Sequence, residues 1–238
     1  MAMNEVLDIR DFHESSNLKV WSYSGSSDQL VLSFSGIGSS PVAVQPYEFA
    51  KVATCNGKHS ALFFSDKTRS WLNTQGLVEE IVNAIQEFSK QTPFVATHSL
   101  GHSMGGFMAL AMPKFVPIQT ALAFAPQFSV NPTVVPDETR WKEYTGRINK
   151  FLISDLEDVF TNTTTYSIIH GRHGREAPQR DIFPERSNLR RYILPKTHHN
   201  VPQILKRNSL LLPVFEASLA GRNRRIRLLL NTIGGYSK

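Results

Sequence analysis

Short apolar segments alternate with helix-like stretches over most of the chain. Six of the apolar segments have the length and residue types of buried strands: Leu30–Phe34, Ser60–Phe64, Phe94–Thr97, Ala121–Phe124, Tyr166–Ile169 and Arg191–Leu194. Weaker patterns predict two more strands, at Leu18–Tyr23 and just before it. Strands that alternate with helices form a mostly parallel sheet, so we expect an α/β protein with helices on both faces of a central sheet.

The stretch between the second and third of these six strands has helical spacing. Its apolar residues recur about every 3.6 positions and therefore share one face: Leu77, Ile81, Val82, Ile85 and Phe88. Asn73 or Thr74 is expected to cap this helix, because short polar side chains satisfy the free amides at a helix start.

Residues 128–165 form the one long insertion between predicted strands. Pro132 and Pro136 are followed there by the helix-like run WKEYTGRINKFLISDLEDVF. We expect this insertion to form either a small lid over the site or a packed crossover helix. No repeat, low-complexity tract or linker interrupts the pattern, so residues 1–238 are predicted to form a single domain.

The composition is that of a soluble globular protein, with 41% hydrophobic and 19% charged residues among 238. The N-terminal run MAMNEVLDIRDFHESS lacks the apolar core of a secretion signal, and no segment approaches the roughly 18 apolar residues of a membrane span. We therefore predict a cytoplasmic protein without a membrane span. The single Cys55 excludes an internal disulfide and argues against a structural zinc site.

The net charge of +6 raises the question of an acidic partner. The positive residues are spread along the chain, and the densest group lies near the C-terminus: Arg222, Arg224, Arg225 and Arg227. We expect these arginines to form a solvated helix face, with a docking patch as the alternative. No nucleic-acid partner is predicted, and the oligomeric state is not indicated.

The run LGHSMGGFMAL contains a Gly-x-Ser-x-Gly pattern centred on Ser103. Ser103 directly follows a strand-like run and directly precedes a small-residue helix that Pro113 is expected to end. Gly101 and Gly105 suit this turn, because it is strained and the neighbouring backbone approaches too closely for a Cβ. A serine at such a strand-to-helix turn is a candidate nucleophile.

GHSMGG, together with FSGIG upstream and THHNVP downstream, resembles the α/β-hydrolase fold family over roughly residues 30–212. The resemblance implies a serine hydrolase without metal or cofactor, in which Ser103 forms an acyl-enzyme. FFSDKTRSW, GHSMGG and AFAPQFSV also resemble a bacterial branch associated with surface polysaccharide production. That second resemblance implies a small-molecule or glycan-linked acyl substrate.

A serine nucleophile needs a histidine base and an acid that orients the histidine. The family's usual Gly-His ending corresponds to His198 and His199, which makes His199 the expected base. The acid should follow the strand YSIIHG, but Gly174 stands where the family commonly has aspartate. Glu176 is the favoured replacement, and Asp181 is the alternative.

Two backbone amides should stabilise the oxyanion, one of them from Met104, the residue after the nucleophile. FSGIG occupies the place of the family's oxyanion loop, so the second amide is assigned to Ile37, between Gly36 and Gly38.

Arg69 and Trp71 are candidate substrate-binding residues, because their segment should leave the carboxyl end of a strand near the catalytic mouth. An arginine and a flat aromatic wall would suit a sugar or an acidic glycan. The alternative is structural, with Asp66 and Arg69 paired to brace a loop and Trp71 covering the core.

These features predict a serine hydrolase that cleaves an ester or thioester. The alternative is a catalytically silent protein of the same fold that serves binding or assembly in a glycan pathway. The absence of aspartate at the expected acid position supports that alternative.

Overall fold

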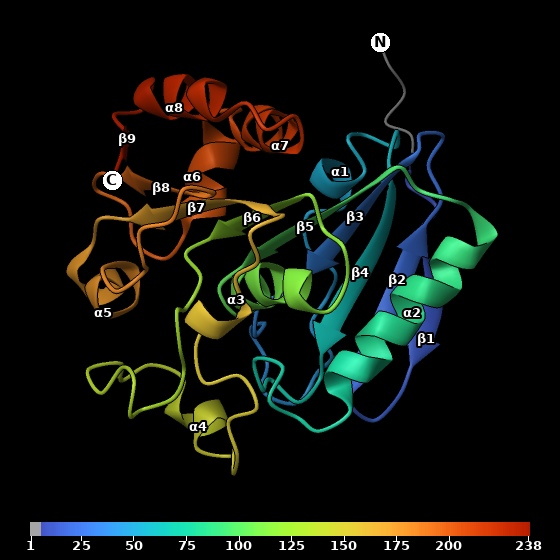
Figure 1. The fold of residues 1–238 in the computed structure, drawn as a ribbon, viewed down its shortest axis with the longest axis horizontal. Coiled ribbons are helices and arrows are strands. Elements are labelled where there is room, and N and C mark those ends of the chain that lie inside the picture. Colours follow the sequence, from blue (N-terminus) through green and yellow to red (C-terminus); the bar gives the residue numbers. More distant parts are fainter. Residues whose placement is uncertain (1–5) are drawn as a thin grey trace.

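A computed structural model describes residues 6–238, which form a nine-stranded sheet covered by helices on both faces (Figure 1). The strand order across the sheet is β1-β2-β4-β3-β5-β6-β7-β8-β9. Strands β3 to β8 are parallel, and β1, β2 and β9 pair in antiparallel fashion at the edges. The predicted α/β architecture is therefore confirmed. The strands are β1 Arg10–Glu14, β2 Leu18–Tyr23, β3 Gln29–Phe34, β4 Ser60–Asp66, β5 Ala96–His102, β6 Thr120–Phe124, β7 Thr165–Gly171, β8 Leu189–Leu194 and β9 Tyr236–Ser237.

Two apolar clusters cover the sheet, one on each face. Helices α2 and α3 contribute to one cluster, and α1, α6, α7 and α8 contribute to the other. Burial of both sheet faces explains why the parallel strands are continuous apolar runs rather than alternating ones. The helices are α1 Ala50–Ala53, α2 Leu77–Gln91, α3 Met104–Ala111, α4 Lys142–Thr145, α5 Ala177–Arg180, α6 Val201–Arg207, α7 Leu211–Leu219 and α8 Asn223–Asn231.

The strand expected at Phe94–Thr97 begins at Ala96 and continues to His102. Its later residues include polar side chains that the sequence pattern does not mark as strand. These side chains find partners within the fold: His98 bonds Gln29 and Thr120, and the Ser99 hydroxyl donates to the Ala109 carbonyl. Satisfied polar groups can be buried at little cost, which allows the strand to extend to the turn at Ser103.

The expected cap of α2 is wrong. The helix begins after Gly76, whose φ of 83° is left-handed, and no side chain caps it. Asn73 instead donates to the Ser70 and Trp71 carbonyls and accepts from the Ile153 amide. Asn73 therefore joins the start of this region to a segment 80 residues later in the chain.

The expected crossover helix within residues 128–165 does not form. The segment contains the single-turn helix α4 and a 3₁₀ turn at Glu157–Val159, connected by irregular chain. Apolar residues from this segment, including Ile153, Leu156 and Phe160, are buried in the core cluster with α2 and α3. These buried side chains attach the segment to the core, although the segment forms no continuous helix.

The chain leaves β3 toward β4 and leaves β5 toward β6, so the connections after these two adjacent strands run in opposite directions along the sheet. Such a reversal opens a crevice at the carboxyl ends of the strands, where ligands commonly bind. The loop after β3 and the turn after β5 meet at this crevice. Within residues 6–238, no helix is long and apolar enough to cross a membrane.

The four arginines near the C-terminus lie at the start of and along α8, where they are exposed. The opposite face of α8 buries Ile226, Leu229 and Leu230 against the sheet. This amphipathic arrangement fits the solvated helix face.

Candidate active site

Ser103 lies in a sharp turn between β5 and α3, with φ 57° and ψ −123°. This conformation is strained for any residue other than glycine. A Cβ on Gly101 would come within 2.0 Å of the Gly105 carbonyl oxygen, and one on Gly105 within 2.0 Å of the Phe34 carbonyl oxygen. Both glycines are therefore required by close backbone approach, and the turn has the form that the sequence predicts.

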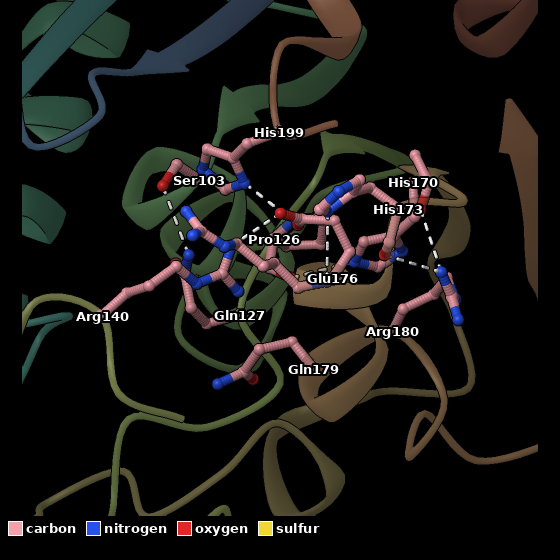
Figure 2. A network of polar contacts seen from close by, with 12 residues as sticks. Ser103, Pro126, Gln127, Arg140, His170, His173, Glu176, Gln179, Arg180 and His199 are labelled. Atoms are coloured by element: carbon pink, nitrogen blue, oxygen red, sulfur yellow. Dashed lines mark hydrogen bonds and ion pairs between the residues drawn. The ribbon is translucent and has the colours of Figure 1, made fainter. Parts of the chain in front are cut away.

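His199 and Glu176 meet at the same edge of the sheet, after β8 and β7. His199 Nδ1 lies 3.1 Å from Glu176 Oε2, which accepts the hydrogen bond (Figure 2). Glu176 is only 2% exposed. The other acid candidate, Asp181, instead pairs with Arg180 and with Lys238 at the surface. The structure therefore brings Glu176, and not Asp181, to His199.

Arg140 holds the second oxygen of Glu176. Its Nη1 donates to Glu176 Oε1 at 2.6 Å, while its Nε and Nη2 donate to Glu138. Burial alone would raise the pKa of Glu176, but the hydrogen bond from His199 and the charge of Arg140 lower it to about 2. Glu176 is therefore ionised at neutral pH and accepts from two donors.

His199 Nε2 is buried and has no hydrogen-bond partner among the described residues. Such an orphaned polar atom is costly unless a reaction uses it. The Ser103 hydroxyl, 4% exposed as a residue, accepts a 3.3 Å hydrogen bond from Gln127 Nε2 (Figure 2). A free ring nitrogen and a weakly held hydroxyl thus occur within one network.

His102 fastens the His199 loop to the turn. His102 Nε2 donates to the His199 carbonyl at 2.8 Å, and the two rings lie 4.8 Å apart. Burial lowers the pKa of His102 to about 4, so its ring is neutral at pH 7. His198 points elsewhere and stacks on His173. The sequence offered no signal for His102 beyond its place beside Ser103.

The loop after β3 lies against the turn, because a Cβ on Gly36 would be 3.9 Å from the Ser103 Cβ. This loop carries Ile37 and Gly38, the latter with a left-handed φ of 74°. Met104 is the first residue of α3. The two residues predicted to stabilise the oxyanion therefore come from adjoining segments on either side of Ser103.

Arg69 is buried beneath this loop, with 4% exposure. Its Nε donates to the Ile37 carbonyl at 2.9 Å, and its Nη2 donates to the Ser40 and Ala43 carbonyls at 2.7 and 2.8 Å. The guanidinium is thus engaged by backbone rather than open to a substrate. The structural alternative accounts for Arg69, although its partners are loop carbonyls and not Asp66.

Trp71 is fully buried and offers no surface to a ligand. Its Nε1 donates to Gln127 Oε1 at 2.9 Å, and Gln127 in turn donates to Ser103. Asp66, the expected partner of Arg69, accepts from the amides of Thr68 and Ser70. Trp71 therefore positions Gln127, which contacts Ser103, and covers the core as the structural alternative expects.

The two residues before α4 contact the side chains of the site. The Trp141 ring lies 5.3 Å from the His199 ring, and the Arg140 guanidinium lies 4.4 Å from the Trp141 ring centre. Trp141 has a left-handed φ of 59°. We call residues 137–150 the lid segment. Sequence reasoning missed Arg140, Trp141 and Gln127, because their partners are distant in the chain.

No group of three or more histidine, cysteine or acidic side chains within residues 6–238 is arranged to hold a metal ion.

Neither a protein-family model nor a curated protein matches this chain. Solved structures do match. A capsule O-acetyltransferase of Neisseria meningitidis serogroup A has a TM-score of 0.60 at 15% identity, over 90% of this chain and 97% of that one. A variant of that acetyltransferase in which alanine replaces one histidine was solved in complex with CoA.

Two further matches are an esterase of Pyrococcus furiosus and an α/β-hydrolase enzyme from a lagoon-sediment metagenome. The esterase has a TM-score of 0.57 at 12% identity, over 90% of this chain and 92% of that one. The metagenomic enzyme has a TM-score of 0.50 at 16% identity, over 87% and 98%. At such identities the likeness is one of fold.

Proposed function

Since the chain has the α/β-hydrolase fold, we propose that it is a serine hydrolase that cleaves an ester or thioester through an acyl-enzyme on Ser103. The observation that carries the proposal is the hydrogen bond between His199 Nδ1 and the buried Glu176, next to the strained turn that holds Ser103. The fold alone would not be sufficient, because one fold serves many functions.

In the proposed reaction, Glu176 keeps the proton of His199 on Nδ1 and leaves Nε2 free as a base. Nε2 takes the proton of the Ser103 hydroxyl while Oγ attacks the acyl carbon. The protonated ring then gives this proton to the leaving oxygen or sulfur as the ester bond breaks. A water molecule releases the acyl group by the same steps, with His199 again acting as the base.

The amides of Met104 and Ile37 are the proposed donors to the oxyanion. The two amides are held in place in different ways. Met104 begins a buried helix, and the loop that carries Ile37 accepts a hydrogen bond from Arg69. Preorganised donors matter in this step, and loss of one typically costs about 3 kcal/mol of transition-state stabilisation.

An acyl group carried on a glycan is the proposed substrate class. Support comes from the resemblance to polysaccharide-associated proteins and from the match to a capsule O-acetyltransferase across nearly the whole of both chains. A second candidate is transfer of the acyl group to a sugar hydroxyl instead of water. Ser103 is only 4% exposed, and exclusion of water favours an alcohol as the acceptor.

The catalytically silent alternative rests on the absence of aspartate at the expected acid position. Glu176 supplies a carboxylate to His199 from another position, which removes that ground.

Labelling with a fluorophosphonate probe tests the proposal. We expect the adduct on Ser103, and we expect Ser103→Ala to lose both labelling and hydrolysis of p-nitrophenyl acetate while remaining folded. Ser99→Ala is the matched control, because Ser99 is a buried serine of β5, the strand that leads to Ser103, and its hydroxyl donates to the Ala109 carbonyl. An adduct on another serine would refute the assignment. Acceleration of p-nitrophenol release by an added sugar acceptor would favour transfer over hydrolysis.

A further inference from the structure

A cavity of about 830 Å³ lies between α1, α6 and the start of α7, and the proposed chemistry does not use it. Its walls are mainly apolar: Phe49, Val52, Pro202, Leu211, Leu212 and Pro213. The volume falls within the roughly 300–1,000 Å³ of small-molecule sites. The cavity therefore has the size and the lining of a ligand site.

The inner wall of the cavity adjoins the loop beside the nucleophile. Glu48 and His102 both line it. A Cβ on Gly36 would lie 3.6 Å from Glu48 Oε1 and 3.9 Å from the Ser103 Cβ, so Glu48 and Ser103 flank the same glycine. The Gly36 amide also donates to the Glu48 carboxyl. The cavity thus adjoins the loop at the glycine that also contacts Ser103.

The outer rim of the cavity is positively charged. Lys206, on α6, lines the cavity and is exposed. Its ammonium makes no ion pair with any carboxylate in the described part of the chain. An anion placed there would gain a charge-assisted contact at the surface.

We propose that this cavity binds an anionic amphiphile of the fatty-acid class. The acyl chain lies along Phe49, Leu211 and Leu212, and the carboxylate lies at Lys206. Burial of the chain supplies most of the affinity, while the charge sets its direction. The chain's inner end contacts Glu48, which holds the loop that carries Ile37.

Titration calorimetry with dodecanoate, below its micelle concentration, tests the site. Ser103→Ala is used so that no acyl transfer contributes heat. We expect one dodecanoate per chain, with about tenfold weaker binding after Lys206→Glu, which corresponds to about 1.4 kcal/mol. Lys90→Glu is the matched control, because Lys90 is an exposed lysine on α2, over the opposite face of the sheet. It should change the affinity less than about twofold.

Two further arms decide between occupants. Ala50→Trp places a large ring on the cavity wall and should abolish binding, with circular dichroism to show that the variant is folded. Dodecyltrimethylammonium, a cation of the same chain length, should bind more weakly than dodecanoate. Absence of dodecanoate binding, equal binding of the cation, or indifference to Lys206→Glu would overturn the proposal. A concentration-dependent dimer that Ala50→Trp disrupts would assign the cavity to a second copy of the chain instead.

This test is separate from that of the proposed function. Dodecanoate binding without fluorophosphonate labelling would refute the hydrolase and leave the cavity assignment standing. Fluorophosphonate labelling without dodecanoate binding would overturn the cavity assignment and leave the hydrolase proposal standing.

Discussion

Glu176 is a single buried carboxylate with a different partner on each oxygen. One oxygen accepts from His199 and the other from Arg140. Burying a carboxylate is expensive, and the two donors offset that cost only while both remain in place. A substitution at Glu176 therefore changes the orientation of His199 as well as the local charge.

The two acid candidates can be separated by isosteric amides. We expect Glu176→Gln to lower kcat for p-nitrophenyl acetate by about 10⁴-fold, because an amide no longer enforces the tautomer that leaves His199 Nε2 free. Asp181→Asn is the control and should change kcat by less than about threefold, because Asp181 pairs only with surface cations. A crippled Asp181→Asn with an active Glu176→Gln would transfer the role to Asp181.

Arg69 is likewise a buried charged side chain with several hydrogen-bond partners, and it lies under the loop that contacts Ser103. We expect Arg69→Met to lower the free energy of unfolding by about 3 kcal/mol, because three loop carbonyls lose their charged donor at once. Hydrolysis of a neutral p-nitrophenyl ester and of an acylated acidic sugar should fall together. Urea denaturation and kinetics on both esters measure these effects. A selective rise in KM for the acidic sugar, with unchanged stability, would restore the substrate-binding role.

At the scale of elements, the lid segment is the least regular part of the site. It has one helical turn. Arg140 fixes it near its start by bonding Glu176, and Ile153, just after its end, is buried and bonds Asn73. A segment made of one short helical turn and irregular chain, with an anchor near each end, is expected to open without unfolding of the sheet. Opening of this kind would uncover Ser103.

Loss of the Arg140 anchor should therefore loosen the lid segment. We expect Arg140→Met to increase amide hydrogen exchange across residues 137–150 and to lower kcat about tenfold, because the carboxylate that orients His199 loses its second donor. Arg147→Met is the control from the same segment, since Arg147 is exposed and its contacts are with Glu143, at 3.5 Å, and with the Tyr144 ring, both within the segment. Unchanged exchange in Arg140→Met would mean that the apolar anchors alone hold the segment.

At the scale of the whole molecule, stability depends on pH through Glu48. Burial raises the pKa of Glu48 from 4.5 to about 7, against the hydrogen bond from Gly36. The folded chain therefore binds this proton more tightly than the unfolded chain does. The resulting stabilisation is complete below about pH 4.5 and is lost as the pH rises through about 7.

Glu48→Gln should flatten this dependence. We expect the variant to exceed the parent protein in free energy of unfolding by about 2 kcal/mol at pH 8 and to show little difference at pH 4, because glutamine carries no charge to bury. Urea denaturation at a series of pH values measures the difference. Glu79→Gln, at an exposed position on α2, serves as the control and should leave the slope of stability against pH unchanged. An equal slope in Glu48→Gln and the parent would exclude Glu48 as the source.

Features that depend on residues close together in the chain could be predicted from the amino-acid sequence. The apolar runs predicted all six parallel strands, because side chains a few positions apart report directly on a sheet buried on both faces. The turn at Ser103 was local only in part, since a Cβ on Gly101 would meet the Gly105 carbonyl within the motif, whereas a Cβ on Gly105 would meet the Phe34 carbonyl of the neighbouring strand. The strand at Tyr236–Ser237 was missed because two residues carry no periodicity.

The tertiary structure alone decided which side chains meet. Glu176 and Asp181 are five positions apart on the same stretch, and only the packing of that stretch against β8 turns the first toward His199 and the second toward Lys238. Likewise, Arg69 was expected at a substrate and lies on carbonyls from a loop that precedes it by 26 to 32 residues. Such partners are set by where strands end relative to one another in space, and the spacing of apolar residues along one chain segment carries no information about that.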